Sequence, residues 1–378
     1  MARIGLVLGA GGVVGHAFHA GVLRALEEVA GVVPNDASLI VGTSAGAVMG
    51  AYLRTGWTTD DVWQLALGTH ASLEGLTADE VAARSQRIME PAWHDPVTLV
   101  RRGIGSAYVA GRSFMRPVPP FVRLPSALPL PSLRLPSVRL PSVPSAPLSS
   151  LRLPLDPLRS VRAVRLPALP SVPTPAVLGR LFPGGLFTMT EGRRRFAEEL
   201  PSEWPERPLW LCAYDIDRGR RVVLGRPGRA PLATLPEAVT ASCAIPGIYD
   251  PVRIGRLTLV DGGAWSTSNL DLAAKAGCEL IVGVVPMAFD TAGPLPAALT
   301  QLVRRVPARM VVGEMADARR RGAEVLLLRP SARELRLHGT NLMRRSGWDT
   351  IARAAYEATA RTLETDRFRS VLAPAAAA

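Results

Sequence analysis

Residues 38–46 have the sequence SLIVGTSAG, and residues 47–51 continue as AVMGA. The apolar residues 38–41 predict a short strand, which enters a sharp turn at Gly42 and leaves it as a helix. On such an elbow the backbone of Ser44 is strained and its hydroxyl stands clear of the sheet, while Gly42 and Gly46 avoid clashes with neighbouring elements. This geometry is that of a hydrolase nucleophile. A Gly/Ser turn before a helix is more often a simple N-terminal cap, so the stretch needs support from elsewhere in the chain.

A second glycine-rich turn lies near the N-terminus. Residues 4–8 (IGLVL) predict a strand, residues 9–15 (GAGGVVG) a loop and residues 17–29 a helix. Backbone N–H groups converge in such a loop, and the helix dipole favours negative charge. The layout therefore predicts a site for an anion or for a developing negative charge.

Two interpretations of this loop compete. A dinucleotide site needs an acidic residue at the end of the second strand, and Asp36 has about the right spacing but precedes that strand. An oxyanion hole needs a nucleophile on an adjacent strand end, which Ser44 supplies. A P-loop is excluded, because no Gly-Lys-Ser/Thr follows the glycines.

An aspartate follows a third predicted strand, far along the chain. Residues 256–260 are RLTLV, and Asp261, Gly262 and Gly263 come next. Active sites of open α/β sheets gather at the carboxyl ends of strands, where this aspartate would lie. On its own, the stretch is better explained as the Asp-Gly turn of an ordinary hairpin.

Taken together, the three motifs resemble the patatin-like phospholipase family. That family combines a glycine-rich loop after its first strand, a G-x-S-x-G elbow and a later D-G-G or D-G-A, and the three occur here in that order. Residues 210–217 look like the family's mid-sheet strand, and residues 241–247 like the helix and turn before its aspartate. The resemblance covers about residues 3–110 and 180–290, with a looser tail to about 365. It implies a three-layer α/β/α fold with a central, mostly parallel sheet.

The resemblance also implies a reaction, the hydrolysis of lipid acyl esters by a phospholipase A or lipid acyl hydrolase. Asp261 would accept the proton of Ser44, Ser44 would attack an ester carbonyl, and water would hydrolyse the acyl-enzyme. The backbone N–H groups of Gly11 and Gly12 would stabilise the oxyanion, and no metal or cofactor is required. The substrate would be phospholipid or another acyl-ester lipid. The remaining motif glycines are Gly9, Gly15, Gly42, Gly46, Gly262 and Gly263.

The histidines leave one alternative open. Only His338 follows the aspartate in the Ser…Asp…His order of α/β-hydrolases, so it carries the rival hypothesis of a true triad. His16 and His19 start the helix after the glycine loop, where a structural role or a place in the pocket wall is the better interpretation.

The glycine loop departs from the family pattern at one point. The family usually has Arg or Lys just before the last glycine of the loop, whereas Val13 and Val14 precede Gly15 here. The Gly11 and Gly12 N–H groups need no side chain, so catalysis is not excluded. The missing cation leaves open how the loop is anchored and whether an anionic headgroup binds beside it.

Much of the formal net charge of +12 lies in residues 116–180, which have nine arginines against one acid, Asp156, and sixteen of the 34 prolines. Proline at this density excludes helix and sheet, so we expect a low-complexity insertion in polyproline II or irregular conformation. It is either a spacer, an arm whose leucines and arginines contact an anionic membrane surface, or a ligand for a proline-recognising domain. Nucleic acid is not an expected partner, because the segment has almost no aromatic residues for stacking.

The overall composition fits a large apolar core in one domain, residues 1–365, with the insertion inside it and a flexible tail at residues 366–378. Apolar residues make up 48% of the chain, and no run of them reaches the length of a membrane span. Three widely spaced cysteines, Cys212, Cys243 and Cys278, predict buried reduced thiols. Because we expect neither a membrane span nor a signal peptide, we expect a cytoplasmic protein, with peripheral membrane contact left open. Two other functions stay open: lipid acyl transfer, and a lipid- or nucleotide-binding module that retains the fold. The oligomeric state has no signal in the sequence.

Overall fold

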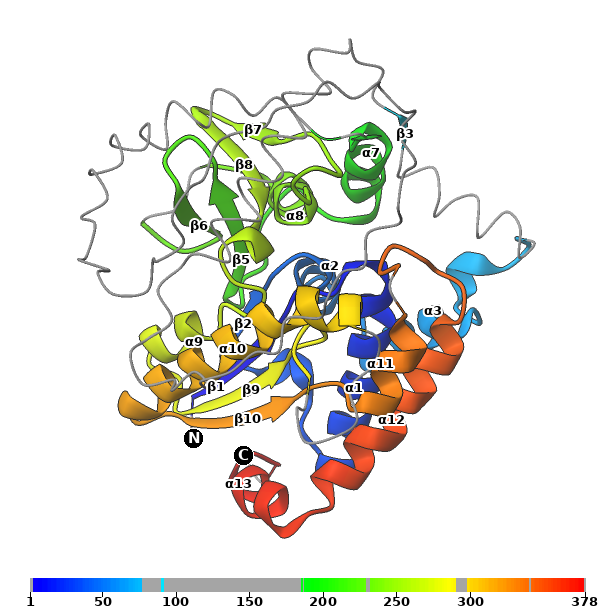
Figure 1. Cartoon of the computed structure of the whole chain (residues 1–378), viewed down its shortest axis with the longest axis vertical. Helices are drawn as coiled ribbons and strands as arrows, with labels where there is room; N and C mark the ends of the chain where they lie inside the picture. The colour runs from blue at the N-terminus through cyan, green and yellow to red at the C-terminus, as the bar shows by residue number, and fades with distance from the viewer. Residues whose placement is uncertain are drawn as a thin grey trace, which may run out of the picture. The chain divides into compact units, whose positions relative to one another are not determined.

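The computed structural model describes residues 3–76, 90–91, 185, 187–228, 232–289, 298–339 and 341–376, which belong to one compact unit that spans residues 1–116 and 173–378. Residues 116–180, expected to be an insertion, lie outside the described residues. A central sheet separates two groups of helices (Figure 1). The predicted three-layer architecture with a mostly parallel sheet is confirmed.

The sheet has eight strands in the order β10-β9-β1-β2-β5-β8-β7, and β6 also pairs with β5. The pairs from β10 to β5 are parallel, whereas β6, β7 and β8 join by antiparallel pairs. The strand bounds are β1 Ile4–Leu8, β2 Leu39–Gly42, β5 Leu209–Asp215, β6 Arg220–Leu224, β7 Val252–Ile254, β8 Leu257–Asp261, β9 Leu280–Val284 and β10 Glu324–Leu328. A separate antiparallel pair joins β3 (Glu90–Pro91) to β4 (Phe187–Thr188).

Alternation along the strands divides the core into two clusters. In β1, Leu6 and Leu8 face one cluster, which also holds side chains of helices α1 (Gly12–Ala30), α2 (Ala45–Arg54) and α12 (Trp348–Leu363). Val7 faces the other cluster, which holds side chains of helices α9 (Asp271–Lys275) and α10 (Ala298–Arg320). Both faces of the sheet are therefore covered, as expected for strands that are apolar throughout.

The helices that cover the first face include α1 and α12, which lie side by side (Figure 1). Their close approach depends on Gly21, since a Cβ there would lie 2.1 Å from the Ala352 carbonyl oxygen. The α-helix bounds are α1 Gly12–Ala30, α2 Ala45–Arg54, α3 Thr59–Leu67, α7 Thr190–Glu199, α8 Leu235–Cys243, α9 Asp271–Lys275, α10 Ala298–Arg320, α11 Ala332–His338, α12 Trp348–Leu363 and α13 Asp366–Ala376. Short 3-10 turns span Pro34–Asp36, Ala71–Leu73 and Gly262–Ala264.

The C-terminal end differs from the flexible tail that we expected at residues 366–378. Residues 366–376 form helix α13, and Leu372 is buried in the first core cluster with Phe368 and Val371 packed against it. These three residues have helical spacing, so one face of α13 is apolar and docks on the domain.

The three cysteines are free thiols, as predicted, with Cys212 and Cys278 buried and Cys243 partly buried. Within the described part of the chain, no helix combines the length and the apolar character that crossing a membrane requires.

Candidate active site

Ser44 stands at the turn between β2 and α2, with φ 55° and ψ −120°. Among the described residues, Asn269 is the only other non-glycine residue with positive φ. Such a conformation is costly for an L-residue and persists where the surroundings enforce it. A Cβ at Gly46 would lie 2.0 Å from the Leu8 carbonyl oxygen, and one at Gly42 would lie 2.7 Å from the Gly46 carbonyl oxygen. The predicted elbow is therefore present, and the two glycines are required because the backbone of β1 and of the turn comes so close.

Hydrogen bonds from the neighbouring strand and helix hold the elbow. The Ser44 backbone N–H donates to Ser242 Oγ at 3.0 Å, and that hydroxyl donates to the Cys212 carbonyl oxygen at 2.7 Å. The Thr43 N–H donates to the Leu8 carbonyl oxygen at 3.0 Å. The backbone on both sides of the nucleophile is thus tied to β1, β5 and α8.

Asp261 reaches Ser44 by a route that the sequence did not indicate. It ends β8, but β8 is antiparallel to β5, so its carboxyl end does not belong to the row of parallel strand ends. The register explains the meeting: Gly42, the last residue of β2, pairs with Leu211, while Asp261 pairs with Ala213 two residues further along β5. Strand β5 continues beyond the end of β2. Ser44, which follows β2, and Asp261, which ends β8, therefore lie at the same height along β5, on its two sides.

The Asp261 carboxylate is buried, with 4% of the residue exposed. It accepts a hydrogen bond from the Gly263 N–H at 2.6 Å. Burial raises the pKa of Asp261 to about 6, and the Ser44 hydroxyl and the Gly263 N–H, which favour the charged carboxylate, lower it by a smaller amount. The carboxyl group therefore titrates close to neutral pH while it contacts the serine.

The glycine loop, residues 9–15, lies against residues just after Ser44 and Asp261. A Cβ at Gly15 would be 3.2 Å from the Ala45 Cβ, and one at Gly263 would be 3.5 Å from the Ala10 Cβ. Gly12 begins helix α1 with φ +62°. Within the described part of the chain, the N–H groups of Gly11 and Gly12 donate to no protein acceptor. They are the unpaired donors that the start of a helix leaves available.

Backbone contacts anchor this loop where the usual cation is absent. The Gly9 N–H donates to Val284 O at 2.9 Å, the Ala10 N–H donates to Thr267 O at 2.8 Å, and the Val14 N–H donates to Leu342 O at 3.0 Å. From helix α1, His19 Nε2 donates to the Gly9 carbonyl oxygen at 2.9 Å. Burial lowers the pKa of His19 to about 4, so the ring is neutral at physiological pH. His19 thus has the structural role expected for it.

The other two histidines pack against aromatic rings. His16 stacks on Trp348, with the centroids 5.8 Å apart, and burial lowers its pKa to about 3. His338 is buried in α11, with its ring edge-on to Phe18 at 5.6 Å. The carboxyl group whose pKa the Ser44 hydroxyl lowers is that of Asp261.

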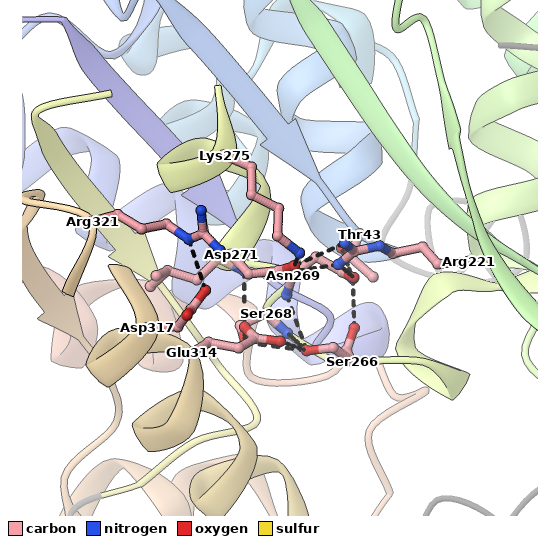
Figure 2. Close-up of polar contacts among 11 residues, drawn as sticks. Thr43, Arg221, Ser266, Ser268, Asn269, Asp271, Lys275, Glu314, Asp317 and Arg321 are labelled. Atoms are coloured by element: carbon pink, nitrogen blue, oxygen red, sulfur yellow. Dashed lines mark hydrogen bonds and ion pairs between the residues drawn. The ribbon is translucent and has the colours of Figure 1, made fainter. Parts of the chain in front are cut away.

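A buried polar network next to the elbow was not predicted from the sequence. It connects Thr43 to Asn269 and to Glu314 of helix α10 (Figure 2). The sequence held one signal of it: the polar run Ser266-Thr267-Ser268-Asn269, which is separated from the Asp-Gly-Gly motif by two residues. Glu314 carried no such signal, because it is one of several charged residues along helix α10.

No metal-ligand set occurs among the described residues: no three His, Cys, Asp or Glu side chains there come together in a way that could hold an ion. The chemistry available at the site is that of a serine, a buried carboxylate and two free backbone N–H groups.

Comparison with known proteins points to one family. The model of the family described as patatin-like phospholipase matches residues 6–102 and 161–274, which is more than half of the chain. A search of curated proteins found no match. Among solved structures, VipD from Legionella pneumophila is similar with a TM-score of 0.38 and 15% identity, over 96% of this chain and 67% of that one. That likeness is too low to support any argument about this chain.

Proposed function

Because the chain belongs to the patatin-like phospholipase family, we propose that it hydrolyses acyl esters of lipids, with Ser44 and Asp261 as the catalytic pair. One observation carries the proposal: a serine on a strained elbow lies beside a buried carboxylate, and its hydroxyl favours the charged form of that carboxylate. Strained backbone at such a turn is typical of nucleophiles.

The proposed reaction has two halves. Ser44 Oγ attacks the ester carbonyl carbon while Asp261 takes the hydroxyl proton, and the carbonyl oxygen becomes an oxyanion. The intermediate then expels the alcohol part of the lipid, which receives the proton from Asp261, and an acyl-serine remains. Water attacks the acyl-serine, with Asp261 again accepting the proton, and the fatty acid leaves as Ser44 regains its hydrogen.

Asp261 is suited to this role by its surroundings. An ordinary aspartate is too weak a base to deprotonate a serine, whereas burial raises the pKa of Asp261 to about 6. The Gly263 N–H holds one carboxylate oxygen at 2.6 Å, which fixes the orientation of the group. The carboxylate is therefore a stronger base than usual and is oriented before substrate binds.

The Gly11 and Gly12 N–H groups are the proposed oxyanion donors. They are unpaired within the described residues and open helix α1, whose dipole favours negative charge at this end. The loop lies beside Ala45, the residue after the nucleophile, so an oxyanion formed at Ser44 would be within its neighbourhood.

Labelling with a fluorophosphonate probe tests the nucleophile. We expect wild-type protein to be labelled and Ser44→Ala to be unlabelled, with Ser202→Ala, a variant at an exposed serine, as the matched control. Release of fatty acid from phosphatidylcholine vesicles should follow the same pattern. Full labelling of the Ser44→Ala variant would contradict the proposal.

His338 provides the test of pair against triad. With Asp261 as the base, we expect Asp261→Asn to abolish turnover and His338→Gln to retain it. If His338→Gln loses as much activity as Asp261→Asn while its melting temperature is unchanged, a triad replaces the pair.

Membrane contact through residues 116–180 is part of the proposal, since the nine arginines there suit anionic headgroups. Wild-type protein should co-sediment with phosphatidylglycerol vesicles, and a variant that lacks residues 117–172 should not. Equal binding of the two would contradict this contact.

A further inference from the structure

The Glu314 carboxylate accepts three hydrogen bonds from residues 266–270, a segment that has no role in the proposed reaction. Its Oε1 accepts from Ser266 Oγ at 2.6 Å, and its Oε2 accepts from Ser268 Oγ at 2.6 Å and from the Leu270 N–H at 2.9 Å. Ser266 and Ser268 are each 1% exposed. One carboxylate on helix α10 thus pins three points of residues 266–270, here called the Ser266–Leu270 segment.

This segment touches each of the three motifs. It follows Asp261 in the chain after the short turn Gly262–Ala264. Thr267 O accepts from the Ala10 N–H of the glycine loop at 2.8 Å. Asn269 Nδ2 donates to Thr43 Oγ1, next to the nucleophile, at 3.0 Å. A shift of the segment would therefore move the elbow and the glycine loop relative to Asp261.

The side-chain amide of Asn269 can donate to Thr43 Oγ1 in only one of its two flipped orientations. Its Oδ1 accepts from Arg221 Nη1 at 2.9 Å, and Arg221 has no acceptor to offer. The amide nitrogen must then face Thr43 Oγ1 and the Ser266 carbonyl oxygen, which it does (Figure 2).

The backbone of Asn269 is itself strained, with φ +54°. Its N–H donates to Ser266 Oγ at 3.1 Å, the same hydroxyl that donates to Glu314. Because an unusual conformation persists only where its surroundings enforce it, the contacts of Glu314 help to keep Asn269 in place.

We propose that Glu314 is a positioning residue for the Ser44–Asp261 pair, acting through the Ser266–Leu270 segment and the Asn269–Thr43 hydrogen bond. The proposal rests on the proposed function. Glu314 does not contact the substrate or the reacting atoms; it fixes the backbone that orients them. A misplacement of reacting groups by about 1 Å is enough to lower the rate of an enzyme about 100-fold.

The experiment compares Glu314→Gln and Glu314→Ala with Asp317→Asn. Asp317 is the matched control, since it is an acidic residue of the same helix whose partners are Arg320 and Arg321 at the surface. We expect kcat to fall about 10- to 100-fold in the Glu314 variants with KM little changed, and the rate of fluorophosphonate labelling to fall in parallel. Asp317→Asn should keep the wild-type values.

Two further readouts separate positioning from a merely structural role. The hydrogen bond from Ser44 lowers the pKa of Asp261, so its weakening should move the acid limb of the pH–rate profile to higher pH. The effects of Glu314→Gln and Asn269→Ala should also be less than additive in the double variant, because both act on one contact. A lower melting temperature with unchanged kcat and an unchanged pH profile would overturn the proposal.

Hydrogen exchange makes the test independent of activity. In Glu314→Ala, the amides of residues 43–46 should exchange faster than in wild type, and in Asp317→Asn they should not. Unchanged exchange would overturn the positioning role whatever the activity. Faster exchange in a protein whose wild type neither labels at Ser44 nor hydrolyses lipid would support the contact and contradict the proposed function instead.

Discussion

Asp261 is a buried carboxylate and Glu314 a partly buried one, and burial raises the pKa of both. Asp261 accepts from the Gly263 N–H and has the Ser44 hydroxyl beside it. Glu314 accepts from two hydroxyls and one backbone N–H, with both oxygens engaged. The difference lies in what surrounds the donors: Ser44 stands on a strained elbow beside unpaired N–H groups, whereas the hydroxyls of Ser266 and Ser268 donate to Glu314. The same chemical group is therefore proposed as a base in one place and an anchor in the other.

The largest expected effect is on turnover. Asp261→Asn should lower kcat about 10³- to 10⁴-fold, since a general base is removed, whereas Glu314→Gln should lower it only about 10- to 100-fold. The measurement is steady-state release of fatty acid by each variant. Equal losses of kcat in Asp261→Asn and Glu314→Gln would contradict the assignment of Asp261 as the base and Glu314 as a positioning residue.

The pH profile of the wild type is the next test. Asp261 must be ionised to accept the Ser44 proton, and its pKa is about 6. We expect kcat/KM to be constant above neutral pH and to fall about tenfold for each pH unit well below pH 6. A profile that is flat down to pH 4 would mean that another group accepts the proton.

The free energy of unfolding should change in opposite directions at the two sites. The pKa of folded Asp261, about 6, lies above its unfolded value of 3.8, so the folded protein binds the proton more tightly and loses stability as the pH rises through this window. At pH 8, Asp261→Asn should therefore be more stable than wild type, by on the order of 2–3 kcal/mol. The gain should shrink as the pH falls and vanish at about pH 3, where the group is largely protonated in both the folded and the unfolded wild type.

Glu314→Gln should instead be less stable at pH 8, by about 1–3 kcal/mol, because an amide cannot accept all three hydrogen bonds, and this loss outweighs the gain from removing a carboxylate whose pKa burial raises. Chemical denaturation of both variants at pH 8 and about pH 3 provides the measurement. If both substitutions stabilise the protein, the desolvation penalty of the Glu314 carboxylate exceeds the stabilisation from its hydrogen bonds, as we expect for Asp261.

The smallest effect is expected at the outer end of the same network. Lys275 Nζ lies 2.8 Å from Asp271 Oδ2 with its side chain 43% exposed, while Arg221 also pairs with that carboxylate. Lys275→Ala should change the free energy of unfolding by less than about 0.5 kcal/mol and leave kcat unchanged. A clear loss of activity would mean that the network transmits strain from its surface to Thr43.

The elements of the site were predictable because they are local. The elbow at Ser44, the loop before α1 and the strand before Asp261 each depend on residues that are neighbours in the chain. We expected residues 366–378 to be a flexible tail because the chain ends in an alanine-rich stretch. The apolar face of helix α13, formed by Phe368, Val371 and Leu372, was therefore not recognised. Glu314 and Asn269 were missed because their partners lie far away in sequence.

The sequence alone determined the fold class and the three motifs, since glycine placement and apolar runs act over a few residues. The tertiary structure decided how the motifs meet. Asp261 approaches Ser44 on an antiparallel strand, because β5 extends beyond β2 and lets β8 end at the level of the elbow. It also decided the proton affinity of Asp261 and the role of Glu314, since burial and hydrogen-bond donors come from segments that only the folded chain brings together.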